Sequence, residues 1–386
     1  MDNYDGLDLK SPEKQAASGE DILIRPATIA DAMYWDTYVS GHPNASPYHL
    51  FSWKTAMERA YNVKTHYLLA ERKGQVVGIL PAARVPRLIG RGPLCSLPYC
   101  DRGEPLADNP AIKASLLNAL VTHATGTHEI RSSASDKDTP VTRAAAEAMA
   151  AGTKVRLLLD LPNDSDTLLA GFKSKHRSQI NKAMKNGLQA ETGNSSALLR
   201  EFYSVFTQNM RDLGSPTHSM NWFTQICSAY GDACRIGVVR LDGRAIGAGI
   251  VLRCGEQAAI PWASTLREFN RLAPNMLLYW TFLAEASDTG IKRFDFGRST
   301  VGEGTYRFKC QWGARPVPLR WSTLCLVTDS KAAGGHSAQI LKGRVGIGRS
   351  GKVMIQLRNS AQAVWRRLPV RLATFAGAKI RRFLSL

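Results

Sequence analysis

Apolar and polar residues follow two successive series of patterns along the chain, and each series predicts a mixture of helices and strands. Alternation with a period of two marks strands, and apolar residues three or four positions apart mark helices. Between the predicted elements, a stretch rich in Pro and Gly, 86–110, predicts a long irregular loop. The first series predicts strands at 22–27, 65–72, 75–85, 129–133 and 154–161, and helices at 28–40, 53–61, 111–125 and 139–150.

The second series resembles the first, which suggests an internal duplication. Residues 71–79 and 240–248 both predict a strand, a polar turn with glycine and a second strand with an interior glycine, Gly78 or Gly247. Such a glycine marks a bulge or a close backbone approach. The alternative is two unrelated hairpins. The second series predicts helices at 164–187, 197–213, 221–230 and 274–288, and strands at 235–241, 244–254, 258–265, 292–297 and 319–327.

The net charge changes this picture mainly at the C-terminus. The chain has 386 residues and a formal charge of +18, of which residues 331–386 carry +12 because they contain no Asp or Glu. The high net charge is therefore a property of the tail more than of the body, and it does not by itself make the whole chain a nucleic-acid-binding protein. We expect a polar, disordered leader (1–21), a first unit (22–160), a second unit with the catalytic site (161–330) and a basic tail (331–386).

The cysteines and the N-terminus predict a cytoplasmic protein. The chain has seven cysteines, and none forms a CxxC pair, which predicts reduced thiols rather than a disulfide framework. No Cys–His cluster has the spacing of a metal site. The N-terminal residues lack the apolar core of a signal peptide, and no run approaches the ~20 apolar residues that span a bilayer.

A first candidate site lies where a strand leads into the helix at 274–288. Pro274 suits the first helical turn, and the free N–H groups of Asn275, Met276 and Leu277 would form a partly positive anion site. Arg271 lies just upstream and would add a full charge. We expect these residues to hold the phosphates of an acyl donor. The alternative is an ordinary capped core helix.

A second candidate site lies in 293–313. Arg298 follows the predicted strand end, Tyr306 and Phe308 would pack the next segment down, and Lys309 would lie as a cation close to the strand end. A fixed ammonium beside an apolar wall is suited to stabilise an oxyanion or a phosphate. The alternative is a structural hairpin with a solvated Lys309.

A third candidate site is the basic segment 173–187. Arg177 and Lys185 lie eight residues apart and share one helix face, and Lys182 adds a further charge. This face would bind a polyanion such as tRNA or a pyrophosphate-linked substrate. A solvated face without a ligand is the alternative.

Taken together, five stretches resemble the FemAB-related proteins of exosortase/PEP-CTERM systems, within the Fem-type aminoacyltransferases and acetyltransferase-fold enzymes. They extend over about residues 90–320. The stretches are LPYCDRGEPLAD, HRSQINKAMKNGL, NMRDLGSPTHSMNWF, NRLAPNMLLYW and FDFGRSTVGEGTYRFKCQWG.

The resemblance implies an α/β (α+β) fold of tandem GNAT-like units with mixed sheets. It implies acyl or aminoacyl transfer to an amine of a cell-envelope or exopolysaccharide precursor, with Phe308 and Lys309 at the active site. Tyr99, in the first stretch, joins the candidate substrate contacts. The Gly-rich pyrophosphate loop of CoA-using members and the coiled-coil arm of some tRNA-using members are both missing. The donor therefore stays open between acyl-CoA and aminoacyl-tRNA.

Direct transfer requires a group that accepts the amine proton. The candidate bases are Asp212, Asp295 and Glu303, and the sequence does not separate them. No Ser–His–Asp or Cys–His arrangement indicates a covalent intermediate, and no metal is expected. The competing hypothesis is a non-catalytic protein that binds a polyanion or a membrane surface through the tail and the segment 173–187.

The tail has an amphipathic pattern interrupted by Pro369. Basic residues flank its apolar stripes, and a basic amphipathic segment with a Trp is typical of proteins that bind anionic membranes. We therefore expect a peripheral contact with the inner face of the cytoplasmic membrane. A disordered tail and a nucleic-acid-binding tail are the alternatives. The stripe residues are Leu357, Ala361, Val364, Trp365, Leu368, Leu372, Phe375, Ile380 and Phe383.

Overall fold

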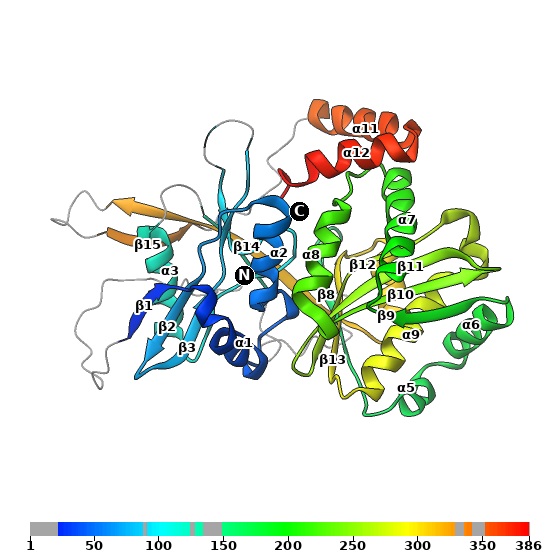
Figure 1. Cartoon of the computed structure of the whole chain (residues 1–386), viewed down its shortest axis with the longest axis horizontal. Coiled ribbons are helices and arrows are strands. Elements are labelled where there is room, and N and C mark those ends of the chain that lie inside the picture. The colour runs from blue at the N-terminus through cyan, green and yellow to red at the C-terminus, as the bar shows by residue number, and fades with distance from the viewer. Residues whose placement is uncertain are drawn as a thin grey trace.

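Two lobes lie side by side in the computed structural model, which describes residues 22–87, 90, 92–123, 128–133, 149–328, 336–341 and 352–385 (Figure 1). The predicted leader lies outside these residues, as does nearly all of the helix predicted at 139–150. Helices and strands alternate in both lobes, as the two predicted series require.

The first lobe is built on an antiparallel sheet of order β1-β2-β3-β6. Helix α3 packs against β2 and β3, and α1 contacts β3. The bounds are β1 Leu23–Pro26, α1 Ala32–Gly41, α2 Phe51–Tyr61, β2 Leu68–Arg72, β3 Gln75–Leu80, β4 Ala83–Arg84, β5 Leu94–Cys95, β6 Leu106–Ala107, α3 Pro110–His123 and β7 His128–Ser133.

The second lobe contains most of an eleven-stranded mixed sheet. Its strands run in the order β8-β13-β12-β11-β10-β9, with α9 and α7 packed against it. The bounds are β8 Lys154–Asp160, α5 Ser165–Gly171, α6 Ser174–Lys185, β9 Gln189–Gly193, α7 Ser196–Leu213, α8 Met220–Tyr230, β10 Cys234–Leu241, β11 Arg244–Cys254, β12 Gln257–Thr265, α9 Pro274–Asp288, β13 Arg293–Thr300, α10 Gly304–Gln311, β14 Arg315–Thr328, β15 His336–Leu341, α11 Lys352–Arg367 and α12 Val370–Arg381.

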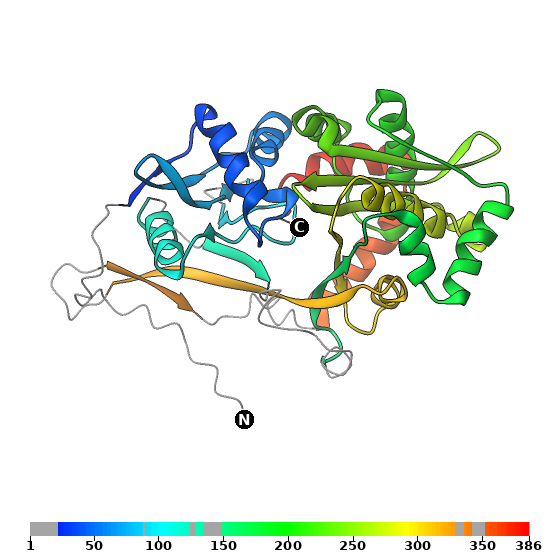
Figure 2. The same cartoon turned by 90° about the horizontal axis from the view of Figure 1, so that it is seen from below.

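Strand β14 joins the two lobes. Its first residues pair with β8, and residues from Leu319 onward pair with β7 of the first lobe. Figure 2 shows this long strand crossing from one lobe to the other. An apolar core also crosses the junction: the rings of Trp53 in α2 and Trp222 in α8 meet edge to face at 5.4 Å. Sheet and core therefore hold the lobes together.

The two predicted hairpins have the same turn geometry. Lys73 and Gly74 between β2 and β3 have φ of 51° and 75°, and Asp242 and Gly243 between β10 and β11 have φ of 49° and 77°. Two successive positive φ values are typical of the type I′ turn, which matches the twist of paired strands. Each hairpin also carries a register shift just before its turn. The local geometry agrees with the predicted duplication.

The glycine in the first hairpin serves a close approach. A Cβ at Gly78 would lie 2.8 Å from Cγ2 of Ile112, so α3 can pack on β3 only where a side chain is missing. At Gly247 the nearest atoms, on Thr265 and Pro274, would be 3.3 and 3.4 Å away. Both glycines thus lie under packed neighbours.

Three boundaries differ from the predicted ones. Strand β8, expected in the first unit, lies between β14 and β13, and its Val155 and Leu157 belong to the core of the second lobe. The body also continues past Ser330, because β15 pairs with β14. The basic segment 164–187 forms two helices, α5 and α6, separated at Phe172 and Lys173, rather than one.

The tail contains two helices that pack on α7 at the top of the second lobe (Figure 1). Gly377 permits this contact, because a Cβ there would lie 2.7 Å from the backbone nitrogen of Thr217. Ala373 is also buried in the contact. Within the described residues, no helix is long and apolar enough to cross a membrane.

Candidate active site at the junction of the lobes

Lys309 is a buried cation at the end of β13. It lies on α10, and only 8% of it is exposed. Its Nζ donates hydrogen bonds to the carbonyl oxygens of Gly297 at 3.3 Å and Arg298 at 3.0 Å. Gly297 has a φ of +73° and lies where the β13–β8 register shifts. The bulge thus turns main-chain carbonyls toward the ammonium group.

Burial has a strong effect on the ionisation of this lysine. It lowers the pKa of Lys309 from its ordinary 10.5 to about 8, and the positive charge of Arg298 acts in the same direction. The carboxylates of Asp295 and Asp101 oppose the shift and stabilise the ammonium form. Lys309 is therefore a cation near neutral pH, and a moderate rise in pH deprotonates it.

Asp295 lies beside Lys309 with both carboxylate oxygens engaged. Oδ1 accepts a hydrogen bond from the backbone N–H of Gly297 at 2.8 Å. Oδ2 lies 3.3 Å from Nη1 of Arg156, on the neighbouring strand β8. Asp295 is 8% exposed, so this ion pair stabilises a carboxylate inside the site and fixes its position.

The first lobe contributes Asp101 to the same cluster. Its Oδ1 lies 3.4 Å from Nε of Arg298, and its main-chain carbonyl accepts a hydrogen bond from Nε1 of Trp321 at 3.0 Å. The guanidinium groups of Arg298 and Arg131 lie over that Trp321 ring, 5.6 and 4.8 Å from its centroid. The cluster is therefore assembled from both lobes and from the strand that joins them.

A buried tyrosine completes the wall on the side of the first lobe. Tyr48 is 4% exposed. Burial raises the pKa of its phenol well above the ordinary value, and the charges of Asp295 and Asp101 act in the same direction. Tyr48 is therefore a neutral phenol close to both carboxylates. Among the described residues, no group of three His, Cys, Asp or Glu side chains could hold a metal ion.

The other predicted catalytic residues lie around this cluster or away from it. Phe308 packs on Tyr279, with ring centroids 5.2 Å apart, and supports α10. Glu303 is exposed at the start of α10. Asp212 lies near the end of α7, where it forms an ion pair with Arg211 at 2.7 Å. The structure thus brings Arg298, Asp295 and Lys309 together.

The predicted phosphate cradle differs in detail from the expectation. Pro274 is the first residue of α9, as predicted, but the N–H of Met276 donates to the carbonyl of Ala273 at 3.0 Å. The side chains of Met276 and Leu277 are buried in the core. Arg271 is exposed and Asn275 is partly buried. The free amide expected at Met276 is therefore already used, as in an ordinary capped core helix.

The basic segment is divided between two roles. Arg177 donates from Nη1 to the carbonyl oxygens of Ala170 at 3.2 Å and Phe172 at 2.5 Å, which ties α6 to α5. Lys182 and Lys185 are exposed on α6.

The predicted substrate contact Tyr99 lies in the first lobe and contacts the tail. It is 4% exposed, and its Oη donates a hydrogen bond to the carbonyl oxygen of Arg382 at 2.8 Å.

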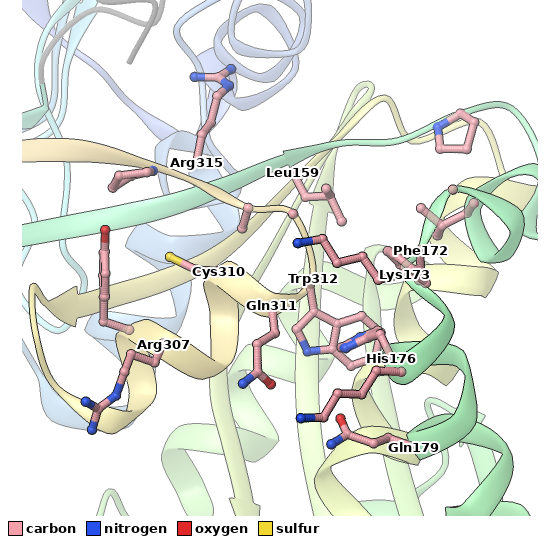
Figure 3. Close-up of a pocket in the computed structure, with 18 of the residues that line it drawn as sticks. Leu159, Phe172, Lys173, His176, Gln179, Arg307, Cys310, Gln311, Trp312 and Arg315 are labelled. Atoms are coloured by element: carbon pink, nitrogen blue, oxygen red, sulfur yellow. The ribbon is translucent and has the colours of Figure 1, made fainter. Parts of the chain in front are cut away.

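A pocket of about 1080 Å³ lies beside α10, next to Lys309 in the chain. Figure 3 shows its walls, with Lys173 and, on α6, His176 on one side and Arg307 and Gln311 of α10 on the other. The predicted Tyr306 lines it. Sequence reasoning singled out neither this pocket nor Asp101, although the stretch LPYCDRGEPLAD contains that aspartate.

Comparison with known proteins places this geometry among acyl-transfer folds. Residues 172–310 match the model of the acetyltransferase (GNAT) domain. The UDP-N-acetylmuramoylpentapeptide-lysine N(6)-alanyltransferase of Weissella viridescens is 25% identical over 166 residues, which are 40% of this chain and 48% of that protein. The chain therefore matches about half the length of this curated relative.

Two solved structures are similar to this chain, and the first of them shows its fold. The crystal structure of FemX superposes with a TM-score of 0.60 at 15% identity, over 77% of this chain and 95% of that one. A tandem GNAT protein from the clavulanic acid biosynthesis pathway has a TM-score of 0.48 at 13% identity, over 78% of this chain and 98% of that one. The match to the GNAT domain and the superposition on FemX confirm the predicted fold of tandem GNAT-like units with mixed sheets.

Proposed function

We propose that this protein is an acyl- or aminoacyltransferase whose reaction takes place at the junction of the lobes. The buried Lys309 ammonium, held beside carboxylates from both lobes, is the observation that carries the proposal. The family model and the curated relative both bear transferase names, which supports the predicted enzyme class.

Lys309 would stabilise the oxyanion that forms when an amine attacks the donor carbonyl. An ammonium group has three N–H donors, and two of those on Lys309 bind the carbonyls of Gly297 and Arg298. The third can point to a substrate oxygen. A donor fixed in advance by two carbonyls needs little reorganisation during the reaction, which is the main source of electrostatic catalysis.

A carboxylate near Lys309 would accept the proton of the attacking amine. Asp101 fits this role better than Asp295, because both oxygens of Asp295 bind protein donors, Gly297 and Arg156. Within the described residues, the carboxylate of Asp101 meets one partner, Arg298, through Oδ1 at 3.4 Å, and Asp101 is contributed by the opposite lobe. We propose Asp101 as the base and Asp295 as the residue that positions the cation.

The acceptor would be an amine of a cell-envelope precursor, of the peptidoglycan or exopolysaccharide class. The name of the Weissella viridescens relative describes transfer of alanine to a lysine N(6) amine, which supports an amine acceptor. The donor would be an aminoacyl-tRNA or an acyl-CoA. The exosortase/PEP-CTERM setting stays a prediction.

A ligand screen followed by a single-turnover assay tests this function. The melting temperature of the full chain is measured with coenzyme A thioesters and with aminoacyl-tRNAs, and the stabilising donor is then tested for transfer to amine-bearing precursors. We expect one donor class to stabilise the protein and Lys309→Ala to abolish most of the transfer. Unchanged turnover in Lys309→Ala would remove the catalytic role of this lysine.

We also propose that the tail holds the enzyme at the inner face of an anionic membrane. Helix α12 leaves Leu372, Phe375 and Ile380 exposed, next to the exposed basic residues Arg371 and Lys379. Apolar groups flanked by cations favour the surface of an anionic bilayer. A purely membrane-binding or polyanion-binding protein is the alternative function, and the presence or absence of transfer activity separates the two.

A further inference from the structure

Two residues that line the pocket beside α10 each have a buried ring nitrogen with no hydrogen-bond partner among the described residues. The nitrogens are Nε2 of His176 and Nε1 of Trp312. His176 is 5% exposed and Trp312 is fully buried, and their rings meet edge to face with centroids 4.2 Å apart. Both residues line the pocket (Figure 3). An unpaired buried polar atom is costly, so these nitrogens indicate that a ligand supplies the missing partners.

The two nitrogens differ in what they can bind. An indole Nε1–H can only donate, so Trp312 calls for an acceptor atom on the ligand. Burial lowers the pKa of His176, which favours the neutral imidazole, whose Nε2 either donates or accepts according to the tautomer. Together they could recognise the edge of a polar planar ring.

The rest of the wall suits a ring and an anion. Phe172 and Tyr306 add aromatic surface to that of His176 and Trp312, and aromatic faces stack on planar bases. Lys173 and Lys175 form no ion pair within the described part of the chain.

The α10 side of the mouth adds two more cations, Arg307 and Arg315. Arg315 lies near Asp160, with Nε 3.6 Å from Oδ2, and Asp160 also meets Arg293 at 3.4 Å. The single carboxylate of Asp160 is therefore shared between two arginines, and the net charge at the mouth of the pocket is positive. Lysine and arginine side chains bind phosphate oxygens through charge-assisted hydrogen bonds.

The pocket is also placed to serve the proposed active site. Tyr306, Arg307 and Cys310 of α10 line it, and Lys309 on the same short helix donates hydrogen bonds to the carbonyls of Gly297 and Arg298. At about 1080 Å³ the pocket reaches the upper end of the range for small-molecule sites. A ligand anchored there can extend past α10 toward Lys309.

We propose that this pocket binds a nucleoside phosphate, which is the nucleotide end of the activated donor. The inference rests on the proposed transferase function and adds to it the anchoring site of the donor. An RNA 3′ end and coenzyme A both carry this chemical group, so the pocket chemistry is shared by the two donor classes.

Isothermal titration calorimetry on the full chain tests the proposal with four probes: adenosine monophosphate, ribose 5-phosphate, coenzyme A and a short RNA hairpin ending in CCA. We expect adenosine monophosphate to bind at least tenfold more tightly than ribose 5-phosphate, because only the nucleotide reaches the aromatic wall. Of the two larger probes, the one that binds more tightly than adenosine monophosphate identifies the source of the nucleotide.

Variants separate the pocket from general attraction to a basic helix. We expect Lys173→Gln and His176→Phe each to weaken the binding of adenosine monophosphate about tenfold, and the phenyl ring keeps an aromatic ring at this position while removing both ring nitrogens. Lys182→Gln removes a charge from the same helix outside the pocket lining and should change binding less than twofold. Equal losses in Lys173→Gln and Lys182→Gln, or no binding of any probe by the wild-type chain, overturn the proposal.

The kinetics distinguish this inference from the proposed function. If transfer depends on Lys309 but the donor KM is unchanged in Lys173→Gln and His176→Phe, the pocket proposal is wrong and the transferase stands. If the nucleotide binds in the pocket but Lys309→Ala keeps full turnover, the catalytic proposal fails while the binding site stands.

Discussion

The main-chain carbonyl oxygen of Ser385 accepts a hydrogen bond from Nη1 of Arg131 at 3.0 Å. The same oxygen accepts a second bond from the backbone N–H of Tyr99 at 2.7 Å, and Oη of Tyr99 donates to the carbonyl of Arg382. The end of the tail is thus bound to the first lobe, while α12 packs on α7 of the second lobe. The tail bridges the lobes next to the wall of the site, because Arg131 also lies over Trp321.

Removing the tail is expected to destabilise the body. Ending the chain after residue 341 removes the three hydrogen bonds to Arg131 and Tyr99, each contributing about 1 kcal/mol, together with the packing of α12. We expect the free energy of unfolding to fall by about 2–4 kcal/mol, measured by urea denaturation. Ser385→Ala is the matched control and should change stability by less than about 0.5 kcal/mol, because the carbonyl makes these bonds. A truncated chain as stable as the full one would show that the bridge contributes nothing.

Removing the cation at the site should slow transfer much more than it weakens donor binding. We expect Lys309→Met to lower kcat about 100- to 1,000-fold, the usual loss when one oxyanion donor is removed. Single-turnover kinetics with the donor found in the screen measures it. Thr305→Ser, an exposed change at the start of α10, is the matched control and should keep full kcat. Arg307 on the same helix is exposed too, but it is unsuitable as a control because it lies at the mouth of the pocket.

The lowered pKa of Lys309 gives two pH dependences. Because the ammonium form is lost as pH rises through about 8, kcat should fall above that pH. Stability should change in the opposite direction. Between about 8 and 10.5 the unfolded state holds a proton that the folded state has released, so the free energy of unfolding rises with pH.

Comparison with Lys309→Met isolates this effect. The stability of the wild type relative to the variant should increase over that window by on the order of 3 kcal/mol, measured by denaturant unfolding at each pH. A constant difference between the two proteins would show that Lys309 titrates normally.

The hairpins were predictable from sequence because their turn chemistry is local. A polar residue followed by glycine specifies the turn at Lys73-Gly74 and at Asp242-Gly243 wherever the chain is placed. The proximity of Lys309 to the end of β13 followed from the strand and the resemblance together. Its helical setting was missed, because the two glycines at 302 and 304 indicate a flexible turn as strongly as a helix start.

Contacts between distant segments were not predictable in this way. Asp101 meets Arg298 only after both lobes fold and β14 carries Trp321 between them, and no periodicity in the sequence encodes that meeting. The packing of the tail depends on the fit of Gly377 against Thr217. The pattern of the tail showed its amphipathic character but not the surface that it would cover.

The two carboxylates of the site should respond differently to substitution. We expect Asp101→Asn to lower kcat about 100-fold, the usual contribution of a general base, with a small effect on stability because this residue is partly exposed. Asp295→Asn should weaken the ion pair with Arg156 and remove the negative charge that stabilises the Lys309 ammonium group. Both the activity and the melting temperature should therefore fall. Comparing kcat with the melting temperature separates the roles: a large loss of kcat at an unchanged melting temperature is expected in Asp101→Asn alone, and an unchanged kcat in that variant contradicts its role as base.

Membrane binding should depend on the exposed face of α12 rather than on charge alone. Leu372 and Phe375 are 57% and 63% exposed, so the double change to Glu should leave the fold intact. Each buried apolar side chain contributes roughly 1.5–3 kcal/mol, so we expect partitioning onto liposomes containing phosphatidylglycerol to fall at least tenfold in co-sedimentation. The matched control replaces Met33 and Tyr34 of the first lobe, which are 68% and 60% exposed, by Glu. Equal partitioning of the α12 double variant and this control would show that the tail does not bind the bilayer, because the two variants differ from the wild type by the same charge.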